Sequence, residues 1–135
     1  MSLIAQCACK IVSIELCSEP IRCFICHCDY CQRMTGSVGN AVAAFKESDV
    51  VAMSDAYELD PQMKKWPGVK RYVCPKCYSN VHWVNPKAYP DTRLVSLGCF
   101  DDPSVFTLSS TVQNQYRPAW CPKFDVPQAF DAYPD

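Results

Sequence analysis

Apolar residues fall at alternate positions early in the chain, which is the pattern of a half-buried β-strand. Val12, Ile14 and Leu16 lie two residues apart with polar residues between them. Longer apolar runs follow and predict more fully buried strands, several of them bounded by Pro, Gly, Asn or Asp. These runs cover 21–25, 38–45, 69–73, 81–84 and 93–100. No apolar period of 3.6 residues lasts long enough to predict a long helix.

Eleven prolines along the chain favour turns and strand ends over helices. Residues 55–68 are expected to form a surface excursion, although Met63 and Trp66 are more apolar than a fully solvated loop needs. Residues 122–135 are rich in Pro and Asp, so we expect a C-terminal tail that lies over the surface outside the sheets. Without an internal repeat or a linker, residues 1–135 are predicted to form one domain.

The cysteine content is far above ordinary usage, with eleven cysteines in 135 residues. Such an excess indicates either disulfides or bound metal. The N-terminal residues have neither the basic region nor the apolar run of a secretory signal, and no stretch approaches the roughly 20 apolar residues of a membrane span. We therefore expect a cytoplasmic protein with no membrane partner, in which clustered thiols bind metal.

The charges do not point to a nucleic-acid partner. The formal net charge is -1, and the 13 basic and 14 acidic residues are spread along the chain. A nucleic-acid backbone would need a concentration of positive charge, so no nucleic acid is expected. A local basic patch on one face remains open, formed by Lys64, Lys65, Lys70, Arg71 and Lys76.

One group of cysteines is split between the start and the middle of the chain. A CxC pair, Cys7 and Cys9, is matched by a CxxC turn, Cys74 and Cys77. Zinc takes four such ligands at tetrahedral positions about 2.3 Å from the metal. A CxC pair can present both sulfurs from an extended strand, because residues two apart point to the same face. We call this set the four-cysteine cluster and expect a structural zinc there; the alternative is that Cys7 and Cys9 are merely buried apolar residues.

A second group lies within six residues and is written CxCxxC. It comprises Cys26, Cys28 and Cys31, which we call the three-cysteine cluster. Three sulfurs can hold one face of a zinc ion and leave the fourth position open, as catalytic zinc sites do. The sequence leaves two alternatives, a disulfide within the motif or a fourth ligand from the protein. The candidates for that fourth ligand are Cys23, His27 and His82.

The charge of an open three-thiolate site favours thiol chemistry. Three thiolates on one divalent ion leave a net charge of about -1, which makes the ion a poor Lewis acid. Such a site is better suited to hold an incoming thiol as its thiolate, ready to attack a small electrophile.

Together these motifs resemble a known family. The chain contains, in order, the CxC pair, CHCDYCQRMTGS, CPKCYSNVHW, LGCFDDPS and RPAW. Over residues 6–120 this is similar to the glutathione-dependent formaldehyde-activating enzymes, also called the centromere protein V family, of Mss4-like fold. The resemblance implies a mainly β protein with small antiparallel sheets stapled by a structural zinc. It further implies a catalytic zinc at the three-cysteine cluster, so two zinc ions per chain.

The activity implied by the resemblance joins glutathione to formaldehyde as S-hydroxymethylglutathione, classed as a carbon-sulfur lyase in reverse. The expected partners are glutathione, or a similar thiol, and a small aldehyde; the oligomeric state, including a homo-oligomer, is left open. Arg33, Thr35, Gly36 and Ser37 offer a cation, two hydroxyls and a flexible backbone for a peptide carboxylate. The alternative is that this stretch is a plain turn into the next strand.

Other residues receive plainer interpretations. Trp120 is expected in the core or at its rim, and Asp101 and Asp102 are expected to brace a turn. Many relatives carry a histidine and an aromatic residue where this chain has 110–114. The cysteines outside the two clusters are expected to be small buried residues; they are Cys17, Cys23, Cys99 and Cys121.

Two competing functions follow from the same fold. One is a non-catalytic Mss4-like zinc module that binds another protein, for which Met63 and Trp66 would form an exposed patch. The other is methionine-sulfoxide reduction, which shares the paired zinc turns but does not need the CxCxxC motif.

Overall fold

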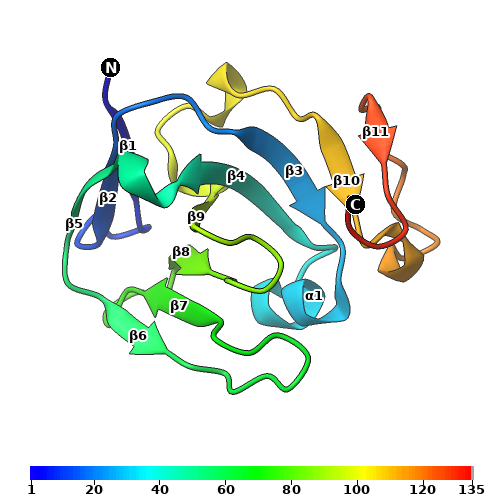
Figure 1. The fold of residues 1–135 in the computed structure, drawn as a ribbon, viewed down its shortest axis with the longest axis horizontal. Helices are drawn as coiled ribbons and strands as arrows, with labels where there is room; N and C mark the ends of the chain where they lie inside the picture. Colours follow the sequence, from blue (N-terminus) through cyan, green and yellow to red (C-terminus); the bar gives the residue numbers. More distant parts are fainter. Residues whose placement is uncertain (135) are drawn as a thin grey trace. The chain divides into compact units, whose positions relative to one another are not determined.

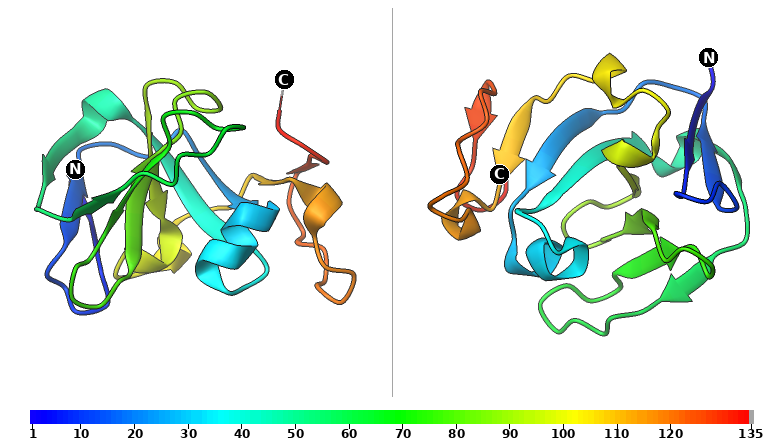
Figure 2. Two further views of the ribbon diagram at one scale, coloured as in Figure 1. Left: turned by 90° about the horizontal axis from the view of Figure 1, so that it is seen from below. Right: turned by 180° about the vertical axis from the view of Figure 1, so that it is seen from behind.

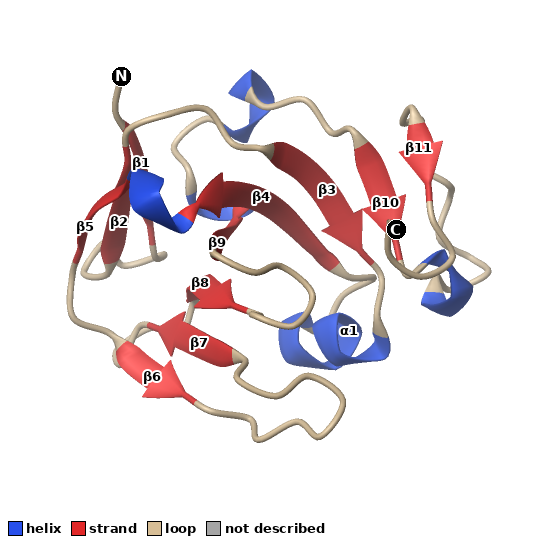
Figure 3. Cartoon of the chain, in the orientation of Figure 1, coloured by secondary structure: helices blue, strands red, loops and turns tan. Residues whose placement is uncertain are grey.

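The computed structural model describes residues 1–134, and their regular secondary structure is mainly β-strand, as the sequence predicted (Figure 1; Figure 3). The chain divides into two units. The first unit comprises Met1–Ile21 and Ala43–Pro103, and the second comprises Arg22–Val42 and residues 104–134. Each candidate metal cluster lies wholly within one unit. The prediction of one domain stays a prediction.

A three-stranded antiparallel sheet in the first unit is built on the alternating apolar pattern. Its order is β1 (Leu3–Gln6), β2 (Ser13–Leu16), β5 (Val50–Met53). Ile14 and Leu16 on β2 are fully buried, and Ile14 pairs with Ala5 on β1. The alternation therefore identified β2 correctly, whereas β1 and β5 were not predicted.

The other strands of the first unit follow one another antiparallel in the order β9, β8, β7, β6. Their bounds are β6 (Tyr57–Leu59), β7 (Lys70–Val73), β8 (Asn80–Val84) and β9 (Thr92–Ser96). The predicted runs at 69–73 and 81–84 are confirmed. The run at 93–100 ends early, because the chain turns into the 3-10 helix η2 (Leu97–Cys99). Part of the expected excursion at 55–68 is the exposed edge strand β6.

In the second unit, β10 (Ser110–Val112) pairs in parallel with both β3 (Arg22–Cys26) and β11 (Gln128–Ala129). Figure 1 and Figure 2 both show these three strands side by side. The helix α1 (Asp29–Thr35) follows β3 and was not predicted. Strand β4 (Asn40–Lys46) confirms the predicted run at 38–45, and the division between the units falls within it. Short 3-10 helices complete the chain, η1 (Glu47–Asp49), η3 (Pro103–Val105) and η4 (Asn114–Tyr116).

The C-terminal tail corrects one expectation. We expected 122–135 to lie outside the sheets, but Gln128 and Ala129 pair with β10. The Phe130 N–H donates to the Thr111 carbonyl at 2.9 Å, and the Gln113 N–H donates to the Ala132 carbonyl at 2.8 Å. The tail's backbone therefore satisfies polar groups along β10 that would otherwise be unpaired. Most of its side chains are nevertheless exposed.

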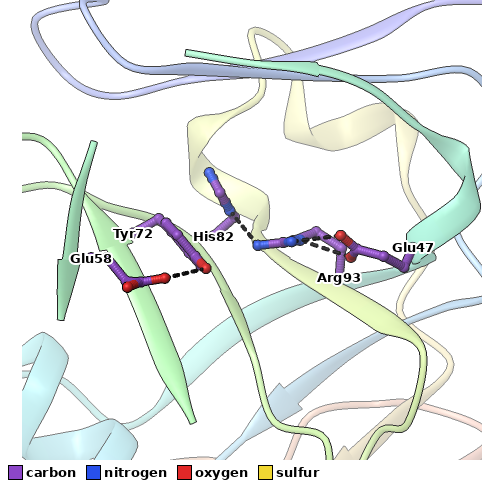
Figure 4. A network of polar contacts seen from close by, with 5 residues as sticks. All are labelled: Glu47, Glu58, Tyr72, His82 and Arg93. Atoms are coloured by element: carbon purple, nitrogen blue, oxygen red, sulfur yellow. Dashed lines mark hydrogen bonds and ion pairs between the residues drawn. The ribbon is translucent and has the colours of Figure 1, made fainter. Parts of the chain in front are cut away.

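Polar side chains form a network of contacts within the first unit (Figure 4). The buried Arg93 guanidinium donates two hydrogen bonds to the Glu47 carboxylate, at 2.9 and 2.6 Å. Arg93 also donates to His82 Nδ1 at 3.2 Å, and His82 stacks on Tyr72 with ring centroids 4.7 Å apart. Since a guanidinium can only donate, His82 Nδ1 must accept, and the ring proton sits on Nε2. Burial and the Arg93 charge lower the pKa of His82 to about 3, so the ring is neutral at physiological pH.

Among residues 1–134 we find no helix with the length and apolar character needed to cross a membrane.

Candidate metal centres

The four-cysteine cluster has the geometry of a tetrahedral zinc site. The Cys9 Sγ lies 3.6 Å from both the Cys7 Sγ and the Cys74 Sγ, and all four sulfurs lie within 4.8 Å of one another. Tetrahedral Zn–S bonds of about 2.3 Å place sulfurs about 3.8 Å apart, close to the observed spacing. The cysteines are free, so the sulfurs are not disulfide partners. This donor set fits zinc.

The local backbone explains how each pair presents its sulfurs. The CxC pair lies in the hairpin turn between β1 and β2, where the Lys10 N–H donates to the Cys7 carbonyl at 2.9 Å and Lys10 has φ +67°. The pair therefore presents its sulfurs from a turn, and not from the extended strand that its spacing also allows, because the turn that pairs β1 with β2 occupies these residues. In the CxxC turn, the N–H groups of Lys76 and Cys77 point at the Cys74 Sγ, each at 3.4 Å.

Ser79 supports the four-cysteine cluster from outside. Its hydroxyl lies 3.1 Å from the Cys77 Sγ and accepts a hydrogen bond from the Ala8 N–H at 3.1 Å. It therefore links the CxxC turn to the CxC turn. The Ser79 hydroxyl and backbone lower the pKa of Cys77 to about 5, which favours the thiolate that metal binding requires.

The three-cysteine cluster is assembled where β3 passes into α1. Cys26 is the last residue of β3, and Cys28 is the N-cap of α1, with its Sγ accepting the Cys31 N–H at 3.1 Å. Cys31 lies in the first turn of the helix, so the helix brings its sulfur back toward the other two. All three sulfurs lie within 4.8 Å of one another, as the CxCxxC spacing predicted.

Hydrogen bonds within the three-cysteine cluster distribute its charge unevenly. The thiols of Cys26 and Cys31 stabilise the Cys28 thiolate and lower its pKa to about 3. The same interaction raises the pKa of Cys26 to about 12, and contacts with both neighbours raise the pKa of Cys31. Within the cluster, the thiolate is therefore favoured on Cys28. Zinc binding would release the protons that the cluster still carries.

No fourth ligand completes the three-cysteine cluster among the histidines, cysteines and carboxylates of residues 1–134. His27 is buried and uses Nδ1 to contact the Val38 carbonyl at 2.8 Å. His82 accepts from Arg93 instead. Cys23 lies on β3 but outside the cluster. A disulfide within the motif is also absent, since all three cysteines are free. The arrangement matches the interpretation of an open coordination position.

Gly39 supports the three-cysteine cluster, and the sequence analysis missed it. Its φ is +157°, and an added Cβ would overlap the Cys26 carbonyl oxygen and lie 3.0 Å from the Cys26 carbonyl carbon. Only glycine lets the chain pass this close to the backbone that carries the first ligand. The sequence does show a glycine eight residues after Cys31. It was overlooked because the nearby Gly36 already accounted for a turn in this stretch.

The predicted substrate residues divide into two kinds. Thr35 is committed to the end of α1, since its Oγ lies 2.8 Å from the Cys31 carbonyl and accepts the Ser37 N–H. Gly36 ends the helix at φ +69°. Arg33 and Ser37 are exposed, and no hydrogen bond of their side chains to the described residues is present. The stretch is therefore partly the plain turn considered above, and the binding role of its residues stays a prediction.

Several other expectations were wrong. Trp120 is 77% exposed rather than in the core or at its rim, and Cys17 is exposed rather than buried. Cys17 lies in a bend directly after β2, and Trp120 lies in a turn. Trp66 is half-buried, and the ammonium groups of Lys65 and Lys87 each lie 5.6 Å from its ring centroid. It does not present the open apolar patch that a protein-binding module would need.

Comparison with known proteins agrees with this geometry. A family model described as "Glutathione-dependent formaldehyde-activating enzyme" matches residues 2–120. No curated protein matches the chain. A crystal structure of a Rhodobacter sphaeroides protein is similar in fold, with a TM-score of 0.55 and 19% identity over 78% of this chain and 97% of that one.

Proposed function

Because this chain belongs to the glutathione-dependent formaldehyde-activating enzyme family, we propose that it adds glutathione, or a similar thiol, to formaldehyde or a related small aldehyde. The observation that carries the proposal is the three-cysteine cluster, which holds three sulfurs and has no fourth ligand in the described part of the chain. A zinc ion held there would lower the pKa of an incoming thiol and keep it as a nucleophilic thiolate. The four-cysteine cluster would hold a second, purely structural zinc.

Residues of the protein would place the cysteine ligands and supply a positive charge for the bound thiol. Gly39 packs against the Cys26 backbone and the Cys31 N–H donates to the Cys28 Sγ, so these contacts would hold the cysteines in place for a bound ion. Arg33 is exposed on the last turn of α1, two residues after Cys31, and its guanidinium can pair with a carboxylate of a tripeptide thiol. Ser37 adds an uncommitted hydroxyl after the helix ends.

The proposed reaction forms one carbon-sulfur bond. The thiol loses its proton, its sulfur attacks the aldehyde carbon, and the carbonyl oxygen takes up a proton to give the S-hydroxymethyl adduct. The reverse reaction breaks that bond and is the carbon-sulfur lyase direction. Neither direction changes the oxidation state of sulfur or carbon overall, so no redox cofactor is required.

Exchange of formaldehyde with glutathione, followed by NMR, tests this function directly. The uncatalysed addition must be subtracted, since it is appreciable. We expect exchange above the background with the zinc-loaded wild type and at least a hundredfold loss of the excess rate in Cys28→Ser. Cys17→Ser is the matched control and should keep the wild-type rate, because Cys17 is exposed and outside both clusters.

Two outcomes would refute the proposal. One is wild-type protein with both zinc sites filled and no exchange above background for any small aldehyde. The other is a Cys28→Ser variant that is folded and as fast as the wild type.

A further inference from the structure

The three-cysteine cluster also contains a pair that can react with disulfides. Cys28 and Cys31 are separated by two residues, and Cys28 precedes the first turn of α1. Their sulfurs lie within 4.8 Å of each other, and the Cys31 N–H is directed at the Cys28 Sγ at 3.1 Å. We propose that this pair exchanges with small-molecule disulfides, with Cys28 attacking and Cys31 resolving, and that the exchange expels metal from the cluster.

Exposure decides which sulfur attacks first. Cys26 is 5% exposed and Cys31 is 9% exposed, whereas Cys28 is half-buried and the most exposed residue of the three. A disulfide must approach the attacking sulfur in line, so the most accessible sulfur of the cluster reacts first. Cys28 is therefore the entry point, and the two buried cysteines are left to complete the exchange.

Backbone geometry decides which cysteine resolves. Disulfides need Cα atoms roughly 4.4–6.8 Å apart. Residues three apart at the start of a helix lie about 5–6 Å apart, well within this range. Residues two apart in extended chain lie about 6.6 Å apart, near its upper limit. Since Cys26 ends a strand while Cys31 lies on the helix, Cys31 is the partner that bonds to Cys28 with less strain.

The steps balance without another reactant. The Cys28 thiolate attacks one sulfur of a small disulfide, forming a mixed disulfide and releasing one thiolate. The Cys31 sulfur, as a thiolate freed from the metal or, without metal, after losing its proton, then attacks the Cys28 sulfur, forming the Cys28–Cys31 disulfide and releasing the second thiolate. Two cysteine thiols are oxidised and one small disulfide is reduced to two thiols. The cluster keeps Cys26 as its only thiol, too few ligands to retain zinc.

This inference goes beyond the addition of a thiol to an aldehyde, because the protein's sulfurs are themselves the reactants and no aldehyde takes part. The two clusters should respond differently. In the four-cysteine cluster the sulfurs come from turns 65 residues apart, and a zinc ion there has all four ligands. In the three-cysteine cluster, the partly exposed sulfur leaves the cluster accessible to disulfides.

Treatment of the zinc-loaded, full-length protein with glutathione disulfide tests the proposal. A Cys17→Ser background removes the exposed cysteine outside the clusters. We expect release of one zinc ion, detected with a chromogenic chelator, and a Cys28–Cys31 disulfide found by peptide mass mapping. In Cys31→Ser the mixed disulfide should accumulate on Cys28. In Cys28→Ser, labelling of the cluster should fall at least tenfold.

The proposal fails if the cluster stays reduced while added disulfide modifies Cys17 in the unsubstituted protein. It also fails if the cluster is labelled as fast in Cys28→Ser as in the Cys17→Ser background. The formaldehyde exchange assay separates the two proposals. Protein that catalyses exchange but resists glutathione disulfide refutes only the redox reaction. Protein that forms the disulfide but leaves formaldehyde exchange at background refutes only the enzymatic function.

Discussion

The four-cysteine and three-cysteine clusters use the same ligand type but differ in how far the protein completes them. The four-cysteine cluster joins two turns that are 65 residues apart, and it needs nothing from outside the first unit. The three-cysteine cluster is built within one short segment and lacks a fourth ligand among residues 1–134. The first arrangement supplies the four ligands of a closed zinc site, while the second supplies three, and the proposed function uses the remaining position for the thiol. With the same ligand type, a zinc site that receives all four ligands from the protein is structural, whereas a site that receives three can bind another ligand.

Removing a ligand from the four-cysteine cluster should have the largest effect. We expect Cys74→Ser to leave the first unit unfolded, because structural zinc contributes roughly 10–16 kcal/mol in small zinc domains and exceeds the stability of most domains. Circular dichroism and thermal unfolding of the purified variant measure this. The matched variant is Cys28→Ser, which should fold and retain one zinc; equal stability of the two variants would contradict the comparison.

Gly39→Ala should damage only the three-cysteine cluster. The added methyl group would overlap the Cys26 carbonyl, so we expect loss of the zinc at this cluster while the zinc at the four-cysteine cluster stays bound. Native mass spectrometry would then show one zinc per chain instead of two. Gly36→Ala is the control, because its Cβ would meet open space and costs only about 1 kcal/mol from the positive φ. Two zinc ions in Gly39→Ala would show that the close approach does not matter.

Weakening the polar network around Arg93 should lower the stability of the first unit without releasing zinc from the four-cysteine cluster. Glu47→Gln leaves the buried Arg93 guanidinium without its carboxylate, and we expect a loss of about 1–3 kcal/mol in the free energy of unfolding. Chemical denaturation of the zinc-loaded protein measures it. The control is Glu58→Gln, whose contacts with Tyr72 and Lys70 are exposed and should be worth less than about 1 kcal/mol. An equal loss in both variants would show that burial of Arg93 contributes nothing.

Trp120→Ala should have the smallest effect. The side chain is 77% exposed, so its removal should change the free energy of unfolding by less than about 0.5 kcal/mol and leave both zinc ions bound. Phe24→Ala is the contrasting variant in the same unit, because Phe24 is 2% exposed and its loss should cost about 3–5 kcal/mol. A Trp120→Ala protein as unstable as Phe24→Ala would mean that Trp120 packs against the fold.

The sequence predicted the parts of the fold that depend on local pattern. Strand β2 followed from alternation, and β7 and β8 followed from bounded apolar runs. The edge strand β6 was not recognised, because its three residues, Tyr57–Leu59, are too few for their alternation to predict a strand. The parallel pairing of β10 with β11 depends on contacts between distant residues, which no local pattern contains.

The cysteine spacing identified both candidate clusters, since ligand identity and spacing are local properties. It did not show the helix that carries Cys31, because seven residues are too few for a reliable 3.6-residue period. It also missed Gly39, whose role arises from a close approach to Cys26 in space. The fourth position of the three-cysteine cluster could be judged only from the positions of His27 and His82, which sequence alone left open.

X-ray absorption spectroscopy of the zinc-loaded protein, before and after addition of glutathione, tests the open position most directly. Seven cysteine sulfurs shared by two zinc ions predict an average of about 3.5 sulfur neighbours per zinc without thiol. Addition of glutathione should raise that average to about 4. Four sulfur neighbours per zinc before any thiol is added, or histidine scattering that persists after it, would contradict the account.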